Sequence, residues 1–243
     1  MAGFPKLKIC GVRDVAFARR AEELGVDYLG FIFAEKSPRY VTPDAAAAIA
    51  ATLGRARCPD FAKATTGKPQ RAVSASVKLV GVFTTSTIEE ILQISRKIPF
   101  DVVQLHSREY GADEISRLKA AGLEVWQLGA KEGAANVADF VNPREGDGVP
   151  DAVLLDGWAG TLCGGTGRRA DWEFASELAS AGVRVVLAGG LSSANIGDAA
   201  ATGCAVLDVN SSLEESPGVK SIALLEELFR AVKSKVWFSR VEM

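Results

Sequence analysis

A repeated alternation of short apolar runs with longer amphipathic segments restricts the fold of this chain more than any other feature. The apolar runs are rich in β-branched and aromatic residues, which is typical of strands buried on both faces of a parallel sheet. We predict strands over residues 6–11, 28–33, 77–83, 101–105, 123–128, 152–155, 183–188 and 205–209. The segments that follow them predict helices over residues 14–25, 43–53, 86–97, 109–121, 134–141, 172–181, 192–202 and 222–233.

Eight strand–helix units favour closure into a barrel over an open doubly wound sheet. A (βα)8 barrel typically needs about 250 residues, and the chain has 243. No GxGxxG motif follows the first strand, which weakens the alternative of a dinucleotide-binding fold. We therefore predict an α/β protein in which residues 1–243 form one (βα)8 (TIM) barrel domain.

One segment breaks the alternation. Residues 54–76 contain prolines, glycines and several basic residues, and they show no hydrophobic periodicity. We predict a long exposed insertion between the second helix and the third strand, with a composition typical of disordered chain. A connection from a helix to the next strand lies at the amino ends of the strands, so the insertion is expected far from the pocket.

Composition excludes several classes of function. The net charge is −2, with 28 basic and 30 acidic residues mixed along the chain, so nothing indicates binding to nucleic acid or to an anionic membrane. No apolar run approaches the roughly 18 residues of a membrane span, and the first residues lack a signal-peptide core. Cys10, Cys58, Cys163 and Cys204 have no metal-ligand spacing and are typical of free thiols. We expect a cytoplasmic monomer or weak homodimer without metal or cofactor.

The residues that follow the predicted strands are candidates for a functional site, because the carboxyl ends of barrel strands face one pocket. These candidates are Cys10, Arg39, Gln104, His106, Asp156, Gly189, Gly190, Ser211 and Ser212. Gln104 and His106 flank Leu105 and should point the same way. Glycine turns after strands seven and eight, with a short helix expected at 216–220, are typical of a phosphate site.

Asp156 ends the sixth predicted strand and precedes a glycine-rich segment that includes Gly164 and Gly165. Glycines at this density predict a mobile loop. A carboxylate under such a loop is typical of a catalytic group in a barrel. From these residues alone, the alternative stays open that Asp156 only begins a turn and the glycines let the chain cross the rim.

Several motifs, in order along nearly the whole chain, resemble the phosphoribosylanthranilate isomerase family. They are KICG (8–11), GFIF (30–33), SPRYV (37–41), VGVF (80–83), QLH (104–106), LLD (154–156), GGTG (164–167), LAGGL (187–191) and DVNSSLEESPGVK (208–220). The resemblance implies a (βα)8 barrel without a cofactor. It also implies an Amadori rearrangement of N-(5-phosphoribosyl)anthranilate to 1-(o-carboxyphenylamino)-1-deoxyribulose 5-phosphate, a step of tryptophan biosynthesis.

The resemblance also implies roles for the candidate residues. Cys10 is similar to the family's general base, Asp156 to its general acid, and Arg39 to the residue that holds the anthranilate carboxylate. Substrate binding is implied for Gln104, His106, Gly164, Gly165, Gly189, Gly190, Ser211 and Ser212. His106, the only histidine, can equally be a structural imidazole.

Two residues depart from the family's usual DVSSGVE segment. Asn210 replaces a serine and Ser212 replaces a glycine, so the phosphate loop is the part of the site that is expected to differ. We expect Ser212 to keep a negative φ and to add a hydroxyl contact to the phosphate. Lys8 shares the face of Cys10, and we expect its charge to lower the pKa of the thiol and to pair with Asp208 inside the barrel.

Three other functions remain as alternatives. Indole-glycerol-phosphate synthase needs catalytic lysines and glutamates at strand ends, and only Lys8 fits. The histidine-pathway isomerase uses aspartates after strands one and five, where this chain has Cys10 and Leu128–Gly129. An inactive barrel that binds a phosphorylated ligand is disfavoured because Cys10 and Asp156 are both present.

Overall fold

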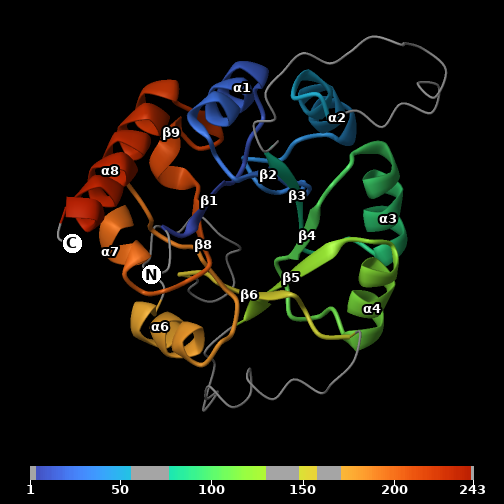
Figure 1. Cartoon of the computed structure of the whole chain (residues 1–243). Coiled ribbons are helices and arrows are strands. Elements are labelled where there is room, and N and C mark those ends of the chain that lie inside the picture. Colours follow the sequence, from blue (N-terminus) through green and yellow to red (C-terminus); the bar gives the residue numbers. More distant parts are fainter. Residues whose placement is uncertain (1–3, 56–76, 130–147, 158–170, 242–243) are drawn as a thin grey trace, which may run out of the picture.

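The strands form the closed parallel barrel that the sequence predicts (Figure 1). The computed structural model describes residues 4–55, 77–129, 148–157 and 171–241. Neighbouring strands pair in chain order, and the last strand pairs with the first to close the barrel. The strands are β1 (Lys6–Ile9), β2 (Tyr28–Ile32), β3 (Lys78–Phe83), β4 (Val102–Leu105), β5 (Glu124–Gly129), β6 (Ala152–Leu155), β7 (Val185–Leu187) and β8 (Val206–Val209).

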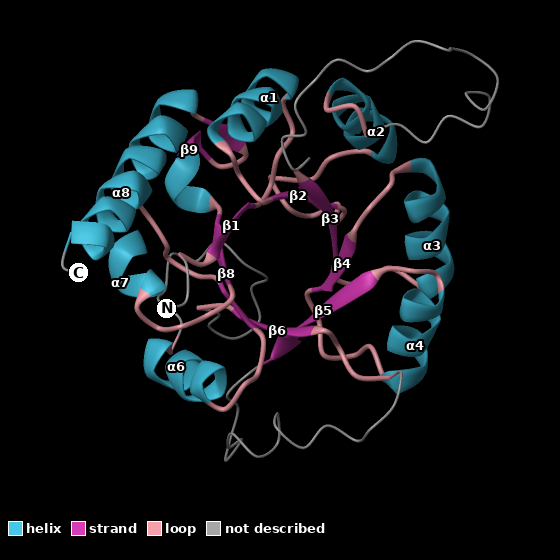
Figure 2. Ribbon diagram, viewed as in Figure 1, coloured by secondary structure: helices cyan, strands magenta, loops and turns pink. Residues whose placement is uncertain are grey.

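Helices surround the barrel and cover the outer faces of the strands (Figure 2). They are α1 (Val15–Leu24), α2 (Pro43–Thr52), α3 (Ile88–Lys97), α4 (Ala112–Ala120), α6 (Trp172–Ser180), α7 (Ile196–Ala200) and α8 (Ile222–Val241). Asp14 caps α1, because its Oδ1 accepts a hydrogen bond of 2.8 Å from the main-chain N–H of Phe17. The helix predicted at 134–141 and residues 56–76 of the predicted insertion lie outside the described residues.

One predicted helix is much shorter in the structure because a side chain competes for main-chain groups. The helix predicted at 192–202 is reduced to the five residues of α7. Asn195 Oδ1 accepts from the N–H of Ser192 at 2.8 Å, and its Nδ2 donates to the carbonyl of Gly190 at 2.8 Å, so residues before α7 form a turn instead. The predicted start of α4 at residue 109 is also wrong, because the helix begins at Ala112 after the N-cap Gly111.

The short helix predicted at 216–220 is wrong, and a hairpin stands in its place. Strands β9 (Glu214–Ser216) and β10 (Val219–Lys220) pair antiparallel and turn at Gly218, whose φ is 84°. That left-handed conformation favours glycine and does not continue a right-handed helix. The short helix of this region is instead η2, a 3-10 turn over Ser211–Leu213.

The barrel interior combines an apolar cluster with one buried ion pair. Tyr28 and Trp126 pack edge to face inside the barrel, with ring centroids 5.1 Å apart. Lys8 Nζ lies 2.6 Å from Asp208 Oδ2, and the two residues are register partners where β1 meets β8. Neither charge would be stable alone in such surroundings. The predicted pairing of Lys8 with Asp208 is therefore confirmed.

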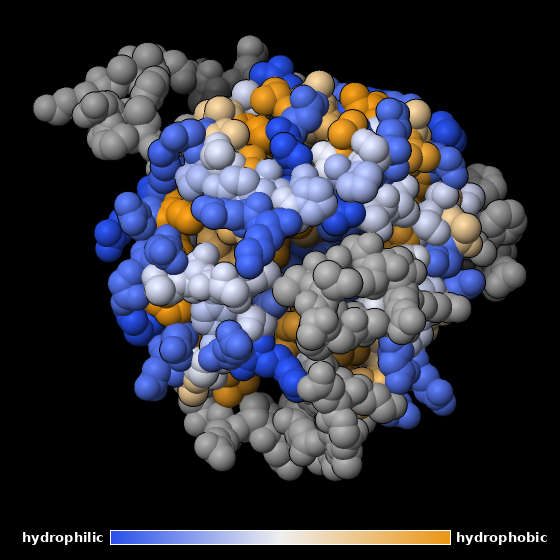
Figure 3. Space-filling view, turned by 180° about the vertical axis from the view of Figure 1, so that it is seen from behind, coloured by the Kyte–Doolittle hydropathy of each residue, from blue (hydrophilic) through white to orange (hydrophobic). Residues whose placement is uncertain are grey.

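The visible surface mixes polar and apolar residues. Figure 3 shows hydrophilic residues over much of one face, with smaller groups of hydrophobic residues between them. Within the described residues, no helix is both long enough and apolar enough to cross a membrane.

The connection between α2 and β3 allows a test of the predicted insertion. Arg55, which precedes it, pairs with Asp101 just before β4, so the segment departs near the amino ends of the strands. We expect replacement of residues 57–75 by a short glycine–serine linker to change the free energy of unfolding by less than about 1 kcal/mol, because loop entropy depends weakly on length. Urea unfolding measures this change. A loss of several kcal/mol would show instead that the segment packs on the barrel.

Candidate active site

One pocket opens at the carboxyl ends of the strands and collects most of the predicted site residues. Its lining includes Cys10, Arg39, Gln104, His106, Asp156, Gly189, Gly190, Asp208, Asn210 and Ser211. Ser212 does not belong to this lining, and Gly164, Gly165 and Cys163 lie outside the described residues. In the described part of the chain, no group of three or more His, Cys, Asp and Glu side chains is placed to hold a metal ion.

Cys10 follows β1 directly and is held at the bottom of the pocket. Its main-chain N–H donates to the carbonyl of Val209 at 2.9 Å, and the residue is 4% exposed. The neighbouring strand leaves room for the thiol at Gly30, where an added Cβ would lie 3.0 Å from Cys10 Sγ. Glycine at position 30 therefore allows the thiol to occupy this place.

The electrostatic surroundings of Cys10 differ from expectation. Burial raises the pKa of the Cys10 thiol, and the charge of Lys8 lowers it without outweighing burial. The expected lowering contribution of Lys8 is therefore confirmed, but burial outweighs it and the net shift of the Cys10 pKa is upward. Burial also acts to lower the pKa of Lys8, but Asp208 and Cys10 raise it by more, so the lysine stays charged beside the thiol.

Asp156 follows β6 and lies close to the only histidine. His106 Nε2 is 3.5 Å from Asp156 Oδ2, and His106 Nδ1 is 3.4 Å from Gln104 Nε2. Gln104 and His106 therefore point the same way, as the strand period predicts. Burial lowers the pKa of His106 although Asp156 raises it, so the imidazole is neutral near pH 7.

The glycine turn after β7 brings main-chain groups to the pocket. Gly189 and Gly190 have φ values of 87° and 67°. A Cβ on Gly189 would lie only 2.3 Å from the main-chain nitrogen of Gly157, so a larger residue does not fit there. Among the described residues, no main-chain hydrogen bond uses the N–H groups of Gly189, Gly190, Ser211 or Ser212.

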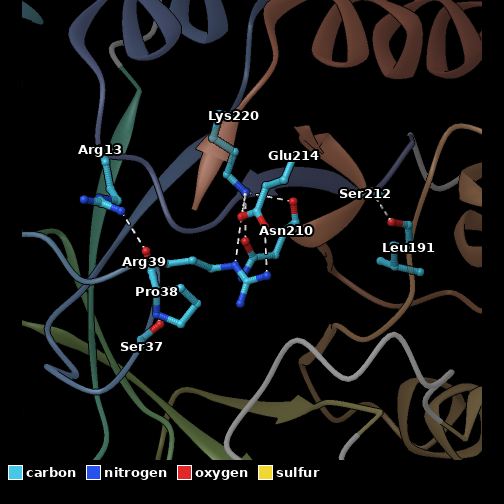
Figure 4. A network of polar contacts seen from close by, with 9 residues as sticks. All are labelled: Arg13, Ser37, Pro38, Arg39, Leu191, Asn210, Ser212, Glu214 and Lys220. Atoms are coloured by element: carbon cyan, nitrogen blue, oxygen red, sulfur yellow. Dashed lines mark hydrogen bonds and ion pairs between the residues drawn. The ribbon is translucent and has the colours of Figure 1, made fainter. Parts of the chain in front are cut away.

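The two residues that depart from the family segment contact other parts of the chain. Ser212 lies in the 3-10 turn, which requires a negative φ as predicted. Its hydroxyl donates to the carbonyl of Leu191 at 2.6 Å, and the expected contact of this hydroxyl with a phosphate stays a prediction. Asn210 Oδ1 accepts from Lys220 Nζ at 2.8 Å, and the Asn210 carbonyl accepts from the same atom at 2.7 Å (Figure 4).

Arg39 is a buried, paired residue at the pocket wall. Its Nε and Nη2 each donate to one carboxylate oxygen of Glu214 at 2.8 Å. Lys220 Nζ lies 3.0 Å from the same carboxylate. Sequence reasoning assigned no role to Glu214 or Lys220, and it assigned to Asp208 only the pairing with Lys8. All three residues lie in the segment 208–220, which begins in the last strand and matches a family motif. That match was the sequence feature that could have identified them as site residues.

The comparisons with known proteins agree on one family. A model described as N-(5'phosphoribosyl)anthranilate (PRA) isomerase matches residues 60–231. A Rhizobium etli (strain CIAT 652) protein named N-(5'-phosphoribosyl)anthranilate isomerase is 34% identical over 234 residues, which cover 94% of this chain and 94% of the relative. A Rubrobacter xylanophilus protein of the same name is 34% identical over 232 residues, covering 94% of this chain and 99% of the relative.

Solved structures lead to the same family. The phosphoribosyl anthranilate isomerase of Thermus thermophilus is 30% identical with a TM-score of 0.74, covering 94% of this chain and 98% of its own. Another isomerase structure, in complex with reduced 1-(o-carboxyphenylamino)-1-deoxyribulose 5-phosphate, is 26% identical with a TM-score of 0.69, covering 95% of this chain and 99% of its own. The chain therefore belongs to the N-(5'-phosphoribosyl)anthranilate isomerase family.

Proposed function

We propose that this isomerase converts N-(5-phosphoribosyl)anthranilate by general acid–base catalysis, with Asp156 as the acid and Cys10 as the base. The observation that carries this assignment is the placement of both side chains in one pocket, although they follow β6 and β1. A relative binds reduced 1-(o-carboxyphenylamino)-1-deoxyribulose 5-phosphate, which supports a substrate of this chemistry. The end of β5 at Gly129 provides no aspartate for the histidine-pathway alternative.

In the first step, Asp156 donates a proton to the ribose ring oxygen. The bond between C1 and that oxygen breaks, and the nitrogen lone pair forms a C=N bond, giving an iminium ion. In the second step, the Cys10 thiolate removes the proton from C2. The C–H electrons form a C1=C2 bond and the C=N electrons return to nitrogen, giving an enolamine that tautomerises to the ketone. In the tautomerisation, the Cys10 thiol protonates C1 and the Asp156 carboxylate takes the enol proton, so Asp156 is again protonated and Cys10 is again a thiolate.

The surroundings of the two catalytic residues support these roles. The ammonium of Lys8 remains charged beside Cys10 and favours a transient thiolate, although burial opposes it. The iminium makes the C2 proton acidic, so a moderate base suffices. The neutral imidazole of His106 places no positive charge beside Asp156, and such a charge would favour the ionised carboxylate over the proton donor.

The remaining substrate groups can be assigned to the two ends of the pocket. We assign the phosphate to the main-chain N–H groups of Gly189, Gly190, Ser211 and Ser212, which other described residues leave without main-chain partners. We assign the anthranilate carboxylate to Arg39, because a guanidinium binds a carboxylate by charge-assisted hydrogen bonds. Gln104 and His106 also line the pocket. The roles of Gly164 and Gly165 stay predictions.

We also propose a cytoplasmic monomer or weak homodimer. Cys10 and Cys204, the cysteines in the described part of the chain, are free, which is typical of a reducing compartment. A Thermotoga maritima structure is described as monomers generated from a dimeric enzyme of the family, so both states occur among relatives.

The reaction itself can be followed directly. We expect purified protein to consume freshly prepared N-(5-phosphoribosyl)anthranilate, measured as loss of its anthranilate fluorescence. No consumption by folded protein would support the alternative of an inactive barrel that binds a phosphorylated ligand.

Asp156→Asn tests the proposed acid. We expect a folded protein whose kcat falls by about 10²–10⁴-fold, because an amide has no proton to donate to the ring oxygen. Asp151→Asn is the matched control, since Asp151 precedes the same strand at the opposite end of the barrel and bonds the N–H of Val125. It should alter kcat by less than about twofold. A rate near that of the wild type in Asp156→Asn removes Asp156 from the mechanism.

The pH profile of kcat tests the proposed base. In the reactive form, Asp156 carries a proton and Cys10 is a thiolate. The alternative form, with a Cys10 thiol and an ionised Asp156, binds the same number of protons, so pH does not change the ratio of the two forms. The fraction of the reactive form is therefore constant at neutral pH, and on the alkaline side kcat should fall as the pH rises through the pKa of Cys10, which burial raises.

Cys10→Ser should lower kcat by about 10²-fold or more and remove this alkaline decline. Cys204→Ser is the matched control, because Cys204 is a second buried thiol that does not line the pocket. It should leave the profile unchanged. An unchanged alkaline decline in Cys10→Ser would assign the titration to another group.

A further inference from the structure

Arg39 is held by a carboxylate that lies far away in the sequence. Arg39 Nε and Nη2 donate to Glu214 Oε1 and Oε2, both at 2.8 Å, which is the forked geometry of a strong arginine–carboxylate pair. Lys220 Nζ also donates to Glu214 Oε1, at 3.0 Å. The side chains of Arg39, Glu214 and Lys220, here called the buried triad, are 10%, 4% and 2% exposed.

The hairpin that carries Glu214 and Lys220 also packs against the loop that carries Arg39. An added Cβ on Gly218 would lie 2.2 Å from the carbonyl oxygen of Pro38, so the two segments touch through their main chains. Arg13 Nη1 donates to that same carbonyl at 2.7 Å. Figure 4 shows the contact of Arg13 with Pro38 and the pairing of Arg39 with Glu214. The arginine is therefore fixed through its side chain and through the residue before it.

The buried triad has an excess of one positive charge. Two cations share one carboxylate, and the bonds from Arg39 with the charge of Lys220 lower the pKa of Glu214 although burial raises it. A lysine has three donors, and Lys220 uses them on Glu214 Oε1, Asn210 Oδ1 and the Asn210 carbonyl. Lys220 therefore has no free donor with which to bind an anionic ligand.

Arg39 is the member of the buried triad that can present this charge to a ligand. In the described part of the chain, no hydrogen bond uses Arg39 Nη1, and Figure 4 shows one guanidinium nitrogen directed away from Glu214. Arg39 lines the pocket, whereas Glu214 and Lys220 do not. A buried cation of this kind is most stable when an anion approaches its remaining donors.

We infer that Glu214 is a positioning residue that orients Arg39, and that the buried triad makes the enzyme specific for N-aryl phosphoribosylamines with an ortho-carboxylate. The inference rests on the proposed contact of Arg39 with the anthranilate carboxylate. By occupying Nε and Nη2, Glu214 leaves one edge of the guanidinium for the substrate. By binding Glu214, Lys220 keeps that carboxylate ionised and the fork in place.

A pair of substrates tests this inference. N-(5-phosphoribosyl)anthranilate and its analogue without the carboxylate, N-(5-phosphoribosyl)aniline, can both be made by condensing the amine with ribose 5-phosphate. The measured quantity is the ratio of kcat/KM for the first substrate to kcat/KM for the second. We expect Glu214→Gln to lower this ratio by about tenfold or more, mainly through KM for the carboxylated substrate, because an oriented hydrogen bond to a charged group is lost.

Arg39→Ala and the double variant with Glu214→Gln complete a double-mutant cycle. Arg39→Ala should lower the ratio at least as much as Glu214→Gln, and the double variant should lower it no further, because Glu214 acts through Arg39. Glu226→Gln is the matched control, since Glu226 accepts from Nε and Nη2 of Arg20 outside the pocket. It should leave the ratio unchanged.

The outcomes separate the two proposals. Equal losses for both substrates in Glu214→Gln would show a general structural role and overturn the inference. A lowered ratio in Arg39→Ala with an unchanged ratio in Glu214→Gln would overturn it while leaving the role of Arg39 intact. An unchanged ratio in Arg39→Ala would overturn the carboxylate contact itself. If Glu214→Gln does not fold, the same ratio of kcat/KM values is measured for Glu214→Asp. A severalfold lower ratio then supports the inference, and an unchanged ratio overturns it.

Discussion

The ion pair between Lys8 and Asp208 joins the first strand of the barrel to the last. These two residues are register partners across the β1–β8 seam, and their side chains meet at 2.6 Å inside the barrel. Removing one partner would leave an uncompensated buried charge, which typically costs about 3–5 kcal/mol. Cys10 follows Lys8 on one strand and Asn210 follows Asp208 on the other. The pair therefore fixes the place from which both the proposed base and the loop after β8 enter the pocket.

The barrel could be predicted because its strands and helices are encoded locally. Uniformly apolar strands and capped amphipathic helices identify themselves in the sequence, and Asp14 caps α1 as its type predicts. The failures occur where particular side-chain or main-chain contacts, rather than helical propensity, decide the local conformation. Gly218 turns a hairpin against Pro38, and Asn195 bonds Gly190 to stop a helix, so neither region follows its own helical propensity. A pattern of residue types contains no information about such partners.

The candidate site, too, could be predicted from the sequence only in part. The two-residue period of a strand places Gln104 and His106 on one side, and the ends of strands place Cys10 and Asp156 at one rim. The period gives the direction of a side chain but not the depth to which it is buried. Burial is the factor that raises the pKa of Cys10 against the charge of Lys8. The partner of Arg39 could not be predicted either, because Glu214 is 175 positions away in the chain.

The closure of the barrel by β8 also has a consequence for synthesis on the ribosome. During synthesis, Lys8 emerges 200 positions before its partner Asp208. Until then, the lysine side chain belongs in water, and the strand that carries it cannot settle into an apolar interior. The amino-terminal part of the chain is therefore kept from burying β1 permanently before the last strand arrives. This delay disfavours a closed barrel with too few strands during translation.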